Sequence, residues 1–259
     1  MSFKNAMMIQ PSSRLASVAT ARLRSIPCHR RRDTSTAATT VSNDTRILAT
    51  QKWLDNIVIG QKLCPFAPSV RSAPQLRLRV SSSVNEDTLV KEVAVEARIL
   101  VGKDNRSEKY HPRPETTLLV LNEDIYPEMS DFRNLVKASW RLQAESLVDN
   151  GFASDLQIVL FHPLAKHDTY ADPDDCADFT IRSPHAMVHL LREADVLRGV
   201  QGGYKDLEGL PSRNKAKMRK EGFDTCLRRL ELCRTNLGTP AGGLGERSLS
   251  CELQKGPID

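Results

Sequence analysis

Hydrophobic positions follow two periods that alternate along the chain. Apolar residues three and four positions apart, the spacing of a helix with one buried face, occur over residues 46–62, 86–100 and 131–149. Short apolar or alternating runs, typical of strands, occur over residues 75–80, 116–121 and 156–161. This alternation predicts an α/β fold: a single domain with a small parallel or mixed sheet of about three strands, flanked by helices.

The same patterns set the bounds of the domain. It is predicted to cover residues 46–237, and its last helix is predicted to run from about Lys215 to Leu237. Residues 1–45 are predicted to be a transit peptide and a linker of small polar residues. Residues 238–259 contain the run GTPAGGLGERS, which has few apolar residues to pack, and they are predicted to be a disordered tail.

The densest group of ionisable residues follows the third predicted strand, between positions 172 and 193. His162 comes at the end of that strand and leads into this stretch. In sheets of this kind, ligands bind in the crevice at the carboxyl ends of the strands. We therefore place the functional site at this edge, with residues 172–193 as its main part.

A helix is predicted to begin inside this polar stretch. Ser183 supplies a hydroxyl suited to a helix N-cap, and Pro184 follows at the first helical position. The helix would run from Pro184 to about Leu197. One of its faces would then carry four ionisable side chains, those of His185, His189, Arg192 and Glu193.

Three interpretations of this face stay open. It could be a solvated surface with an ordinary His189–Glu193 pair. It could bind an anion, because Ser183 and Arg182 lie at a helix N-terminus, whose free N–H groups attract phosphate or carboxylate, and Arg192 could reach the same ligand. It could hold a metal ion through His189 and Glu193, but no H-x-x-x-H or H-E-x-x-H pattern supports this, and no metal ligand is predicted.

Three carboxylates lie within four residues in the segment Asp172-Pro173-Asp174-Asp175. They could form a solvated turn that is closed by side-chain hydrogen bonds. Alternatively, Asp174 could act as a general base with His162 or His189 as its proton partner, because imidazole titrates near neutral pH.

Cys64 is the one cysteine among six that we would test for reactivity. At the end of the preceding helix it would be an unreactive, buried thiol. If Pro65 instead opens a new turn, Cys64 lies at the N-terminus of that turn and the thiolate is favoured. No C-x-x-C pair is present, so neither a zinc ribbon nor a thioredoxin-type motif is predicted. Cys226 and Cys233, two helical turns apart, are predicted core residues.

Basic residues are concentrated at the N-terminus. Residues 1–32 hold 7 of the 37 Lys and Arg residues and no acid, so the rest of the chain has 30 basic and 32 acidic residues. A body without a basic excess is not expected to bind nucleic acid. The Arg- and Ser-rich, acid-free leader predicts a mitochondrial protein, with the plastid as the alternative. No apolar run approaches the roughly 18 residues that span a bilayer, so no membrane partner is predicted.

Several motifs occur together in a fixed order. They are Trp53-Leu54, Leu63-Cys64-Pro65-Phe66-Ala67, Glu115-Thr116-Thr117, Phe161-His162-Pro163, Pro173-Asp174-Asp175, Arg182-Ser183-Pro184, His189-Leu190-Leu191-Arg192-Glu193 and Pro211-Ser212-Arg213-Asn214. Over about residues 46–222 the chain therefore resembles a mostly bacterial family, the domain of unknown function 1415. The resemblance implies a bacterial-type domain to which an organelle leader and a C-terminal tail have been added, and it brings no reaction with it.

The chain departs from the pattern of that family at three places. His185-Ala186 stands where the family pattern has an aromatic residue and proline, and Asp178 and Ile181 stand where it has asparagine. These departures argue against positions 178 and 181 as shared catalytic groups. They also favour His189 over His185 as the essential histidine.

The sequence favours a soluble organellar enzyme that acts on a small anionic or phosphorylated metabolite by His/Asp acid–base chemistry. The candidate catalytic residues are His162, His189, Asp174 and Cys64, and the candidate anion-binding residues are Arg182, Arg192 and Ser183. The alternative is a non-catalytic metal- or ligand-binding or assembly factor that uses Cys64, His162, His189 and Glu193. Both require Cys64, His162, Asp174, Arg182 and His189 to meet in one pocket. The sequence assigns neither a cofactor nor an oligomeric state.

Overall fold

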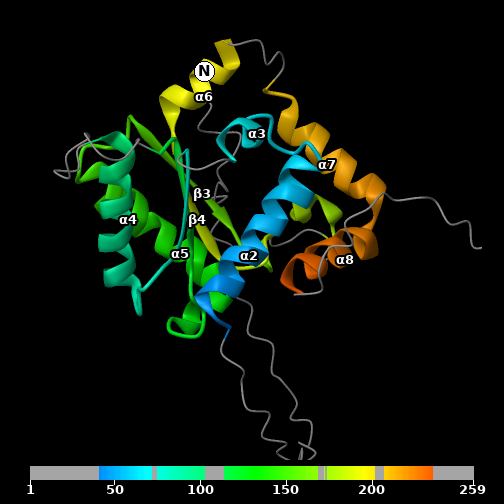
Figure 1. The fold of residues 1–259 in the computed structure, drawn as a ribbon, viewed down its shortest axis with the longest axis horizontal. Coiled ribbons are helices and arrows are strands. Elements are labelled where there is room, and N and C mark those ends of the chain that lie inside the picture. Colours follow the sequence, from blue (N-terminus) through cyan, green and yellow to red (C-terminus); the bar gives the residue numbers. More distant parts are fainter. Residues whose placement is uncertain are drawn as a thin grey trace, which may run out of the picture.

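A computed structural model describes residues 41–71, 75–102, 114–168, 172, 174–201 and 207–235, which form a single α/β domain (Figure 1). Residues 1–40, which include the predicted leader and most of the linker, lie outside the described residues, as does the predicted tail. The strands are β1 (Leu76–Val80), β2 (Thr116–Val120), β3 (Leu156–Phe161) and β4 (Met187–Arg192). The three strands predicted from the sequence are thus confirmed, and β4 was not predicted.

The strands form one mixed sheet in the order β1-β2-β4-β3. β1 and β2 are parallel, whereas β4 lies between β2 and β3 and is antiparallel to both. The chain therefore crosses the sheet in one direction from β1 to β2 to β3. Crossovers of one hand that move in one direction place their connecting helices on the same face.

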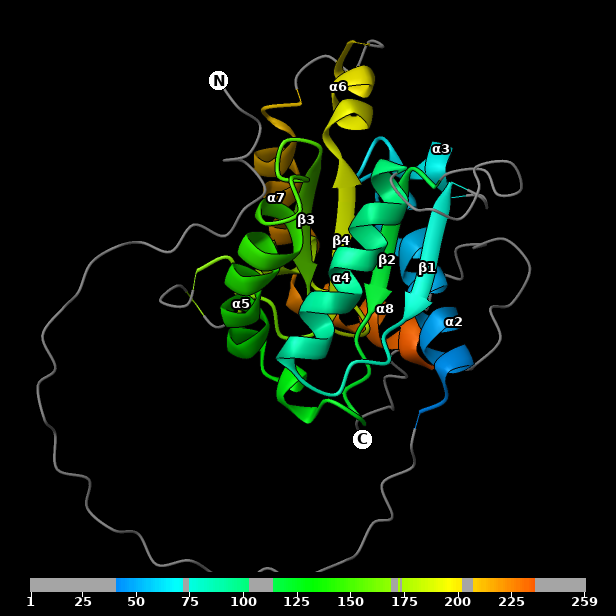
Figure 2. The same ribbon diagram turned by 90° about the vertical axis from the view of Figure 1, so that its left-hand side faces the viewer.

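Those connecting helices cover the first face of the sheet (Figure 2). α4 (Glu86–Val101) joins β1 to β2, while α5 (Phe132–Arg141) and the π-helical turn η3 (Leu142–Val148) join β2 to β3. The side chain of Asn85 caps α4, and that of Asp131 caps α5. A 3-10 turn, η2 (Pro127–Ser130), precedes α5. The buried leucines and valines of these helices pack on the apolar side chains of β2, β3 and β4.

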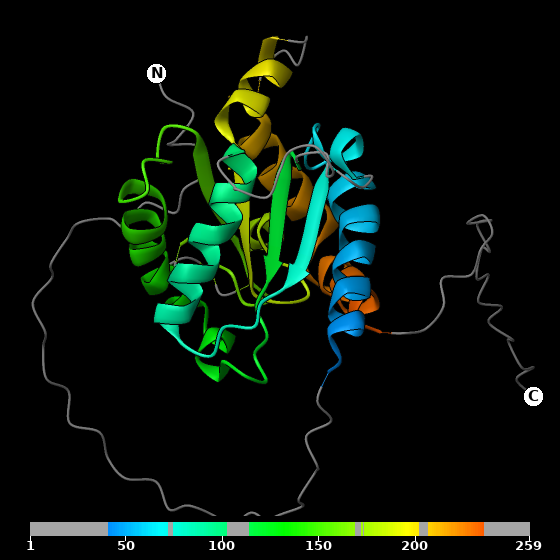
Figure 3. The same cartoon turned by 60° about the vertical axis from the view of Figure 1, so that its left-hand side comes forward.

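A second helical layer covers the other face, so the sheet lies between two layers (Figure 3). It contains α2 (Asn43–Trp53), the π-helical turn η1 (Leu54–Ile59), α3 (Ala67–Val70), the 3-10 turn η4 (Cys176–Thr180), α7 (Leu210–Glu221) and α8 (Phe223–Arg234). Apolar side chains of α2, η1, η4, α7 and α8 share a core with β1, β2 and β4. Cys226 and Cys233 are buried in that core, as predicted.

The C-terminal helix predicted from Lys215 to Leu237 is two helices. Gly222 separates α7 from α8 and has φ 83° and ψ 156°. That conformation is open almost only to glycine, so the helix ends there and a new one begins at an angle. The sequence pattern missed this break because the apolar spacing continues on both sides of Gly222.

The helix predicted from Pro184 to Leu197 is wrong. Met187–Arg192 form the strand β4, and only α6 (Glu193–Gln201) is helical. β4 is central and covered on both faces, so its apolar residues do not alternate, and a short run of this kind cannot be told from a helix by its period. The hydroxyl of Ser183 does not cap a helix; it donates to the carbonyl of His185 at 2.6 Å.

Edge strand β1 is tied to α4 through a buried carboxylate. Arg77 and Arg79 project toward α4, and both donate to Glu96, whose side chain is fully buried. The closest N–O distances are 2.5 Å for each arginine. The side chains of Arg77 and Arg79 are themselves 33% and 40% exposed. This arrangement explains the alternation of Leu and Arg in β1, since its polar face meets Glu96 as well as solvent.

Candidate active site

The structure does not bring the five residues of the predicted pocket together. Arg182 precedes β4 and Arg192 is its last residue. The two arginines therefore lie toward opposite ends of this central strand, about 20 Å apart along it. On a strand, alternate side chains face opposite sides, so His189 and Arg192 no longer share a face. The polar helix face that would have joined His185, His189, Arg192 and Glu193 therefore does not exist.

His162 and His189 lie on opposite faces of the sheet. His162 is buried and its ring packs against Phe132 of α5, with ring centroids 5.5 Å apart. The Nδ1 atom of His162 accepts from the Leu164 N–H at 2.9 Å, and Nε2 lies 3.1 Å from the Met129 carbonyl. Burial lowers the pKa of His162, although the Met129 carbonyl opposes this shift. With both nitrogens bonded to backbone, this histidine fixes the loop that follows β3.

His189 lies in the middle of the sheet on the side of α2 and α8. Its neighbours across the strands are Leu118 and Val159, and its ring lies 6.0 Å from that of Phe161. The Thr116 hydroxyl donates to the Leu190 carbonyl, so it accepts the Nε2–H of His189 at 2.6 Å. Burial lowers the pKa of His189 to about 4, and the ring is neutral at physiological pH.

The other predicted residues are dispersed. Arg192 donates to the carboxylate of Asp195, and burial lowers the pKa of Arg192. Asp174 is exposed in a turn in which its N–H donates to the Asp172 carboxylate at 3.0 Å. Cys64 precedes α3, whose N-cap is Phe66, so the new helical turn begins after Pro65 and not at it. Burial raises the pKa of the Cys64 thiol, against the opposing effect of the Phe66 and Ala67 N–H groups.

One predicted residue, Arg182, lies in a compact polar group. The guanidinium of Arg182 is buried and stacks on the ring of Phe179, 4.6 Å from its centroid. It donates to the Ala165 carbonyl at 3.3 Å and lies 3.7 Å from the carboxylate of Asp178. The indole N–H of Trp53 donates to the Arg182 carbonyl at 3.0 Å, which fixes the backbone here. Arg182 therefore joins α2, η4 and the loop after β3.

His167 completes this group, although the sequence gave no reason to select it. Its backbone N–H donates to the Asp178 carboxylate at 2.8 Å. The Thr180 hydroxyl donates to the Ala177 carbonyl, so it accepts the Nε2–H of His167 at 2.7 Å, and the lone pair of the ring lies on Nδ1. Burial first, and then the charge of Lys215, lower the pKa of His167 to about 4.

Asp178 has the opposite perturbation. It is 3% exposed, and burial raises the pKa of its carboxyl group, against the effects of the His167 N–H and of Arg182. A neutral imidazole and a carboxyl group of raised pKa thus lie in one polar group. Opposite shifts of this kind are a mark of acid–base sites, as well as of buried structural pairs.

The α7 helix supplies cationic side chains on the other side of the group. Arg219 donates twice to Asp175, at 2.9 and 2.8 Å, and this pairing lowers the pKa of Asp175 to about 2. Asp175 also caps η4 through the Ala177 N–H. The charge of Arg219 acts on His167 in the same direction as that of Lys215. We call His167, Asp178, Thr180, Arg182, Lys215 and Arg219 the η4–α7 site.

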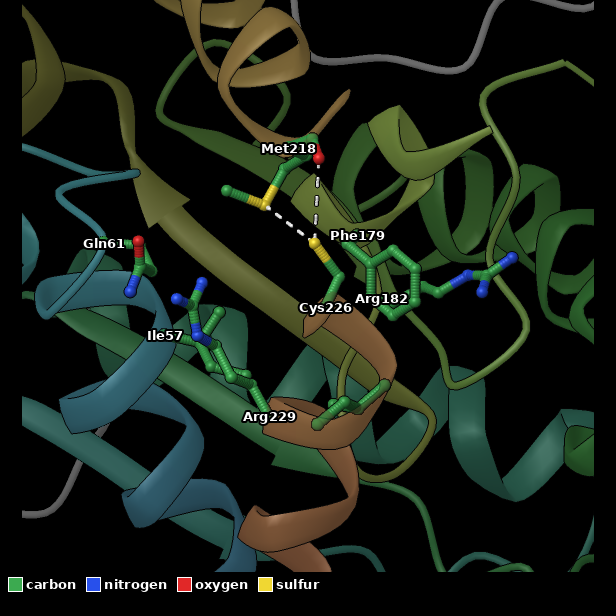
Figure 4. Close-up of a pocket in the computed structure, with 8 residues that line it drawn as sticks. Ile57, Gln61, Phe179, Arg182, Met218, Cys226 and Arg229 are labelled. Atoms are coloured by element: carbon green, nitrogen blue, oxygen red, sulfur yellow. Dashed lines mark hydrogen bonds between the residues drawn. The ribbon is translucent and has the colours of Figure 1, made fainter. Parts of the chain in front are cut away.

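A narrow, mostly apolar crevice lies behind Arg182, between η1, η4, α7 and α8 (Figure 4). Its lining residues are Ile57, Gln61, Phe179, Arg182, Met218, Cys226, Arg229 and Leu230. Figure 4 shows the guanidinium of Arg182 turned away from Cys226 and Met218. Burial raises the pKa of Cys226 to about 11, and its thiol contacts the carbonyl and the sulfur of Met218. The thiol in this crevice is therefore protonated at physiological pH.

A second polar cluster lies at the same sheet edge. Glu123 follows β2, accepts the Ala186 N–H at 3.0 Å and lies 3.5 Å from Nδ1 of His185. The buried guanidinium of Arg46 lies 3.9 Å from Glu123 and donates to Asp124 at 3.0 Å. Burial would raise the pKa of Glu123, but His185, Ala186 and Arg46 together lower it. The cluster therefore holds an ionised carboxylate that joins α2, β2 and β4.

Across the described parts of the chain, no three or more His, Cys, Asp or Glu side chains are placed to hold a metal ion. Likewise, none of the described helices is long and apolar enough to cross a membrane.

Two half-buried histidines, whose pKa values desolvation lowers, predict a pH-dependent stability. His167 and His189 have pKa values of about 4 when folded, below the ordinary value near 6.5. Since their folded pKa values are depressed, their stabilising effect is complete above pH 6.5 and is lost as the pH falls toward 4. The free energy of unfolding should fall between pH 6.5 and pH 4 in both proteins. In His189→Leu, which lacks this titrating ring, we expect the fall to be smaller by about 1–2 kcal/mol.

Urea unfolding at pH 7.5, 6 and 4.5 measures this difference. Thr116→Val is the control, because it removes the hydrogen-bond partner of His189 and keeps the titrating ring. Equal pH profiles for His189→Leu and the native chain would show that His189 does not take up a proton on unfolding.

The fold and the site together define a class: a single-domain α/β protein with a mixed four-stranded sheet and a polar, cation-flanked site at the carboxyl edge of its parallel strands. Within that class, the chain belongs to the family described as protein of unknown function (DUF1415), whose model matches residues 45–228. This confirms the resemblance in the sequence motifs. No curated protein and no solved structure matches the chain.

Proposed function

We propose that the protein is an enzyme that binds a small anionic or phosphorylated metabolite at the η4–α7 site and exchanges a proton with it through His167. One observation carries this proposal: the Asp178 carboxylate holds the backbone N–H of His167, and the neutral ring of His167 lies within electrostatic reach of Lys215 and Arg219. The reaction class is that expected from the sequence, with His167 and Asp178 in place of His162, His189 and Asp174.

The cationic side chains support an anionic substrate. Lys215 and Arg219 lie close enough to His167 to lower its pKa. An anion bound between them would offset their charges, and the pKa of His167 would rise toward neutral pH. An imidazole whose pKa approaches the working pH is an effective general base. Substrate binding would thus prepare Nδ1 of His167 to accept a proton from the bound molecule.

Asp178 and Arg182 act as positioning residues in this proposal. The Asp178 carboxylate holds the backbone N–H of His167, and Arg182 lies beside that carboxylate. The Thr180 hydroxyl, which accepts the Nε2–H of His167, selects the tautomer with the lone pair on Nδ1. Together they hold one ring nitrogen available while the other is bonded.

A ligand screen tests the proposal. We expect inorganic phosphate, or members of a panel of phosphorylated and carboxylate metabolites, to raise the melting temperature of the protein. Lys215→Gln should weaken that binding about 10- to 100-fold, because a charged hydrogen bond contributes about 1.5–3 kcal/mol. In NMR titrations, the pKa of His167 should rise when the anion binds.

Arg133→Gln is the matched control, since Arg133 is an exposed cation on α5, across the sheet from the site. It should bind the same anions as the native chain. If no anion stabilises the protein, or if Lys215→Gln binds as tightly as Arg133→Gln, the proposed site is wrong. Binding that survives His167→Gln without any turnover of the native protein would instead favour the alternative of a non-catalytic ligand-binding protein.

The compartment is also a proposal. The leader lies outside the described residues, and its Arg-rich, acid-free composition supports the mitochondrion, with the plastid as the alternative. The near-neutral charge of the remaining chain supports a small-molecule partner over nucleic acid or a membrane.

A further inference from the structure

An apolar stripe runs along the outer surface of α5 and η3, on the face of the sheet away from the η4–α7 site. It consists of Val136, Trp140, Ala144 and Val148, spaced four residues apart. Trp140 is 59% exposed and Val148 is 54% exposed. α5 is α-helical and η3 is π-helical, and in both forms side chains four residues apart lie almost one above the other, so the four side chains form a continuous strip. A tryptophan in such a strip is a frequent centre of a protein interface.

A row of charges accompanies the stripe. Each residue of the stripe is followed by a charged one, in the order Lys137, Arg141, Glu145 and Asp149. The first half of the row is therefore basic and the second half acidic. Arg141 and Glu145 already pair within the helix at 2.5 Å, whereas Lys137 and Asp149 lie exposed at the two ends.

From these two patterns we infer that this surface binds a second copy of the same chain, with the two helices antiparallel about a two-fold axis. Reversal of the charge row places Lys137 opposite Asp149 of the partner subunit, and the reverse pair forms by symmetry. A parallel arrangement would place like charges together, which is unfavourable.

The sizes of the apolar side chains favour the same arrangement. With the two-fold axis at residue 142, Trp140 faces the partner's Ala144 and Val136 faces the partner's Val148. The partner's Asp149 then lies about 3 Å along the helix from the level of Lys137, within reach of its side chain. A large side chain then meets a small one twice, and two medium ones meet at each end, a pairing of sizes that favours interdigitation. The stripe is thus complementary to itself in both charge and shape, as an interface with two-fold symmetry requires.

Sedimentation velocity of the full chain, over about 1–100 μM, tests this inference. The native chain should pass from monomer to dimer as its concentration rises. Trp140→Ser should weaken dimerisation at least about tenfold, as expected for a central aromatic anchor. Leu164→Ser is the matched control, because Leu164 is equally exposed, at 61%, but lies in the loop after β3. It should dimerise like the native chain.

A charge exchange tests the geometry. Lys137→Glu and Asp149→Lys should each weaken the dimer, whereas the double variant should restore it, because the pairs re-form with their signs reversed. Circular dichroism and the melting temperature of each variant at low concentration establish that it is folded. A native chain that stays monomeric at 100 μM would overturn the inference. So would a Trp140→Ser variant that dimerises normally, or a double variant that is no better than the single ones.

Discussion

Replacing both Arg77 and Arg79 by methionine should lower the free energy of unfolding by about 3–5 kcal/mol. The reason is the position of Glu96, whose fully buried carboxylate has these two arginines as its charged partners. Without them the carboxylate would stay buried and uncompensated. Urea unfolding at pH 7 measures the loss.

The reverse substitution provides the control. Glu96→Met should cost less, because both guanidinium groups are partly exposed and can turn to water. Adding Glu96→Met to the double arginine variant should recover most of its stability, as replacement of a whole buried ion group by apolar residues often does. If Glu96→Met proves as costly as the double arginine variant and rescues nothing, the buried charge is not what these arginines stabilise.

Trp53→Ala should also cost about 3–5 kcal/mol. The ring of Trp53 is 3% exposed and meets Phe161 edge-on at 5.1 Å, so its removal leaves a large cavity between α2 and the sheet. Trp53→Phe keeps much of the ring and loses the hydrogen bond to the Arg182 carbonyl, so it should cost only about 1–2 kcal/mol. Both variants should also weaken anion binding, since Trp53 fixes the backbone of Arg182.

Trp140 provides an internal comparison, because the chain has two tryptophans. Trp140→Ala removes the same side chain from an exposed position, and at low protein concentration it should hardly change the stability. Each variant leaves one fluorophore, so buried and exposed environments can be followed separately during unfolding. A similar loss of stability for Trp53→Ala and Trp140→Ala would contradict the burial of Trp53.

The sequence predicted those helices and strands whose spacing of apolar residues fits only one kind of secondary structure. The strands β1, β2 and β3 and the helices α4 and α5 each have a clear apolar spacing. The pattern failed at β4, where apolar residues at Met187, Leu190 and Leu191 fit a helix as well as a central strand. Ser183 followed by Pro184 also has the sequence of a helix start. In the structure, however, the Ser183 hydroxyl donates to the His185 carbonyl and caps no helix.

The candidate site was located only in part, for a physical reason. Its stretch, its sheet edge and Arg182 were identified, but His167 and Lys215 are 48 positions apart in the sequence, and no periodicity links them. Asp178 was set aside as a departure from the family pattern, although its carboxylate holds the backbone of His167. Such groups come together through the packing of α7 on η4, which a single sequence does not encode as a local signal.

The position of β4 also constrains the order in which the chain can fold. β2 and β3 are not hydrogen-bonded to each other, because β4 lies between them. During synthesis the β1–β2 pair and β3 can therefore be joined into one sheet only after residues 187–192 have left the ribosome. By then three strands and both crossover helices have already been made. The nascent domain exposes an open edge on each half during that interval, and such edges are sites of mispairing. The last of these strands to be made thus joins the two parts of the sheet, and the second face is covered only when α7 and α8 have followed it.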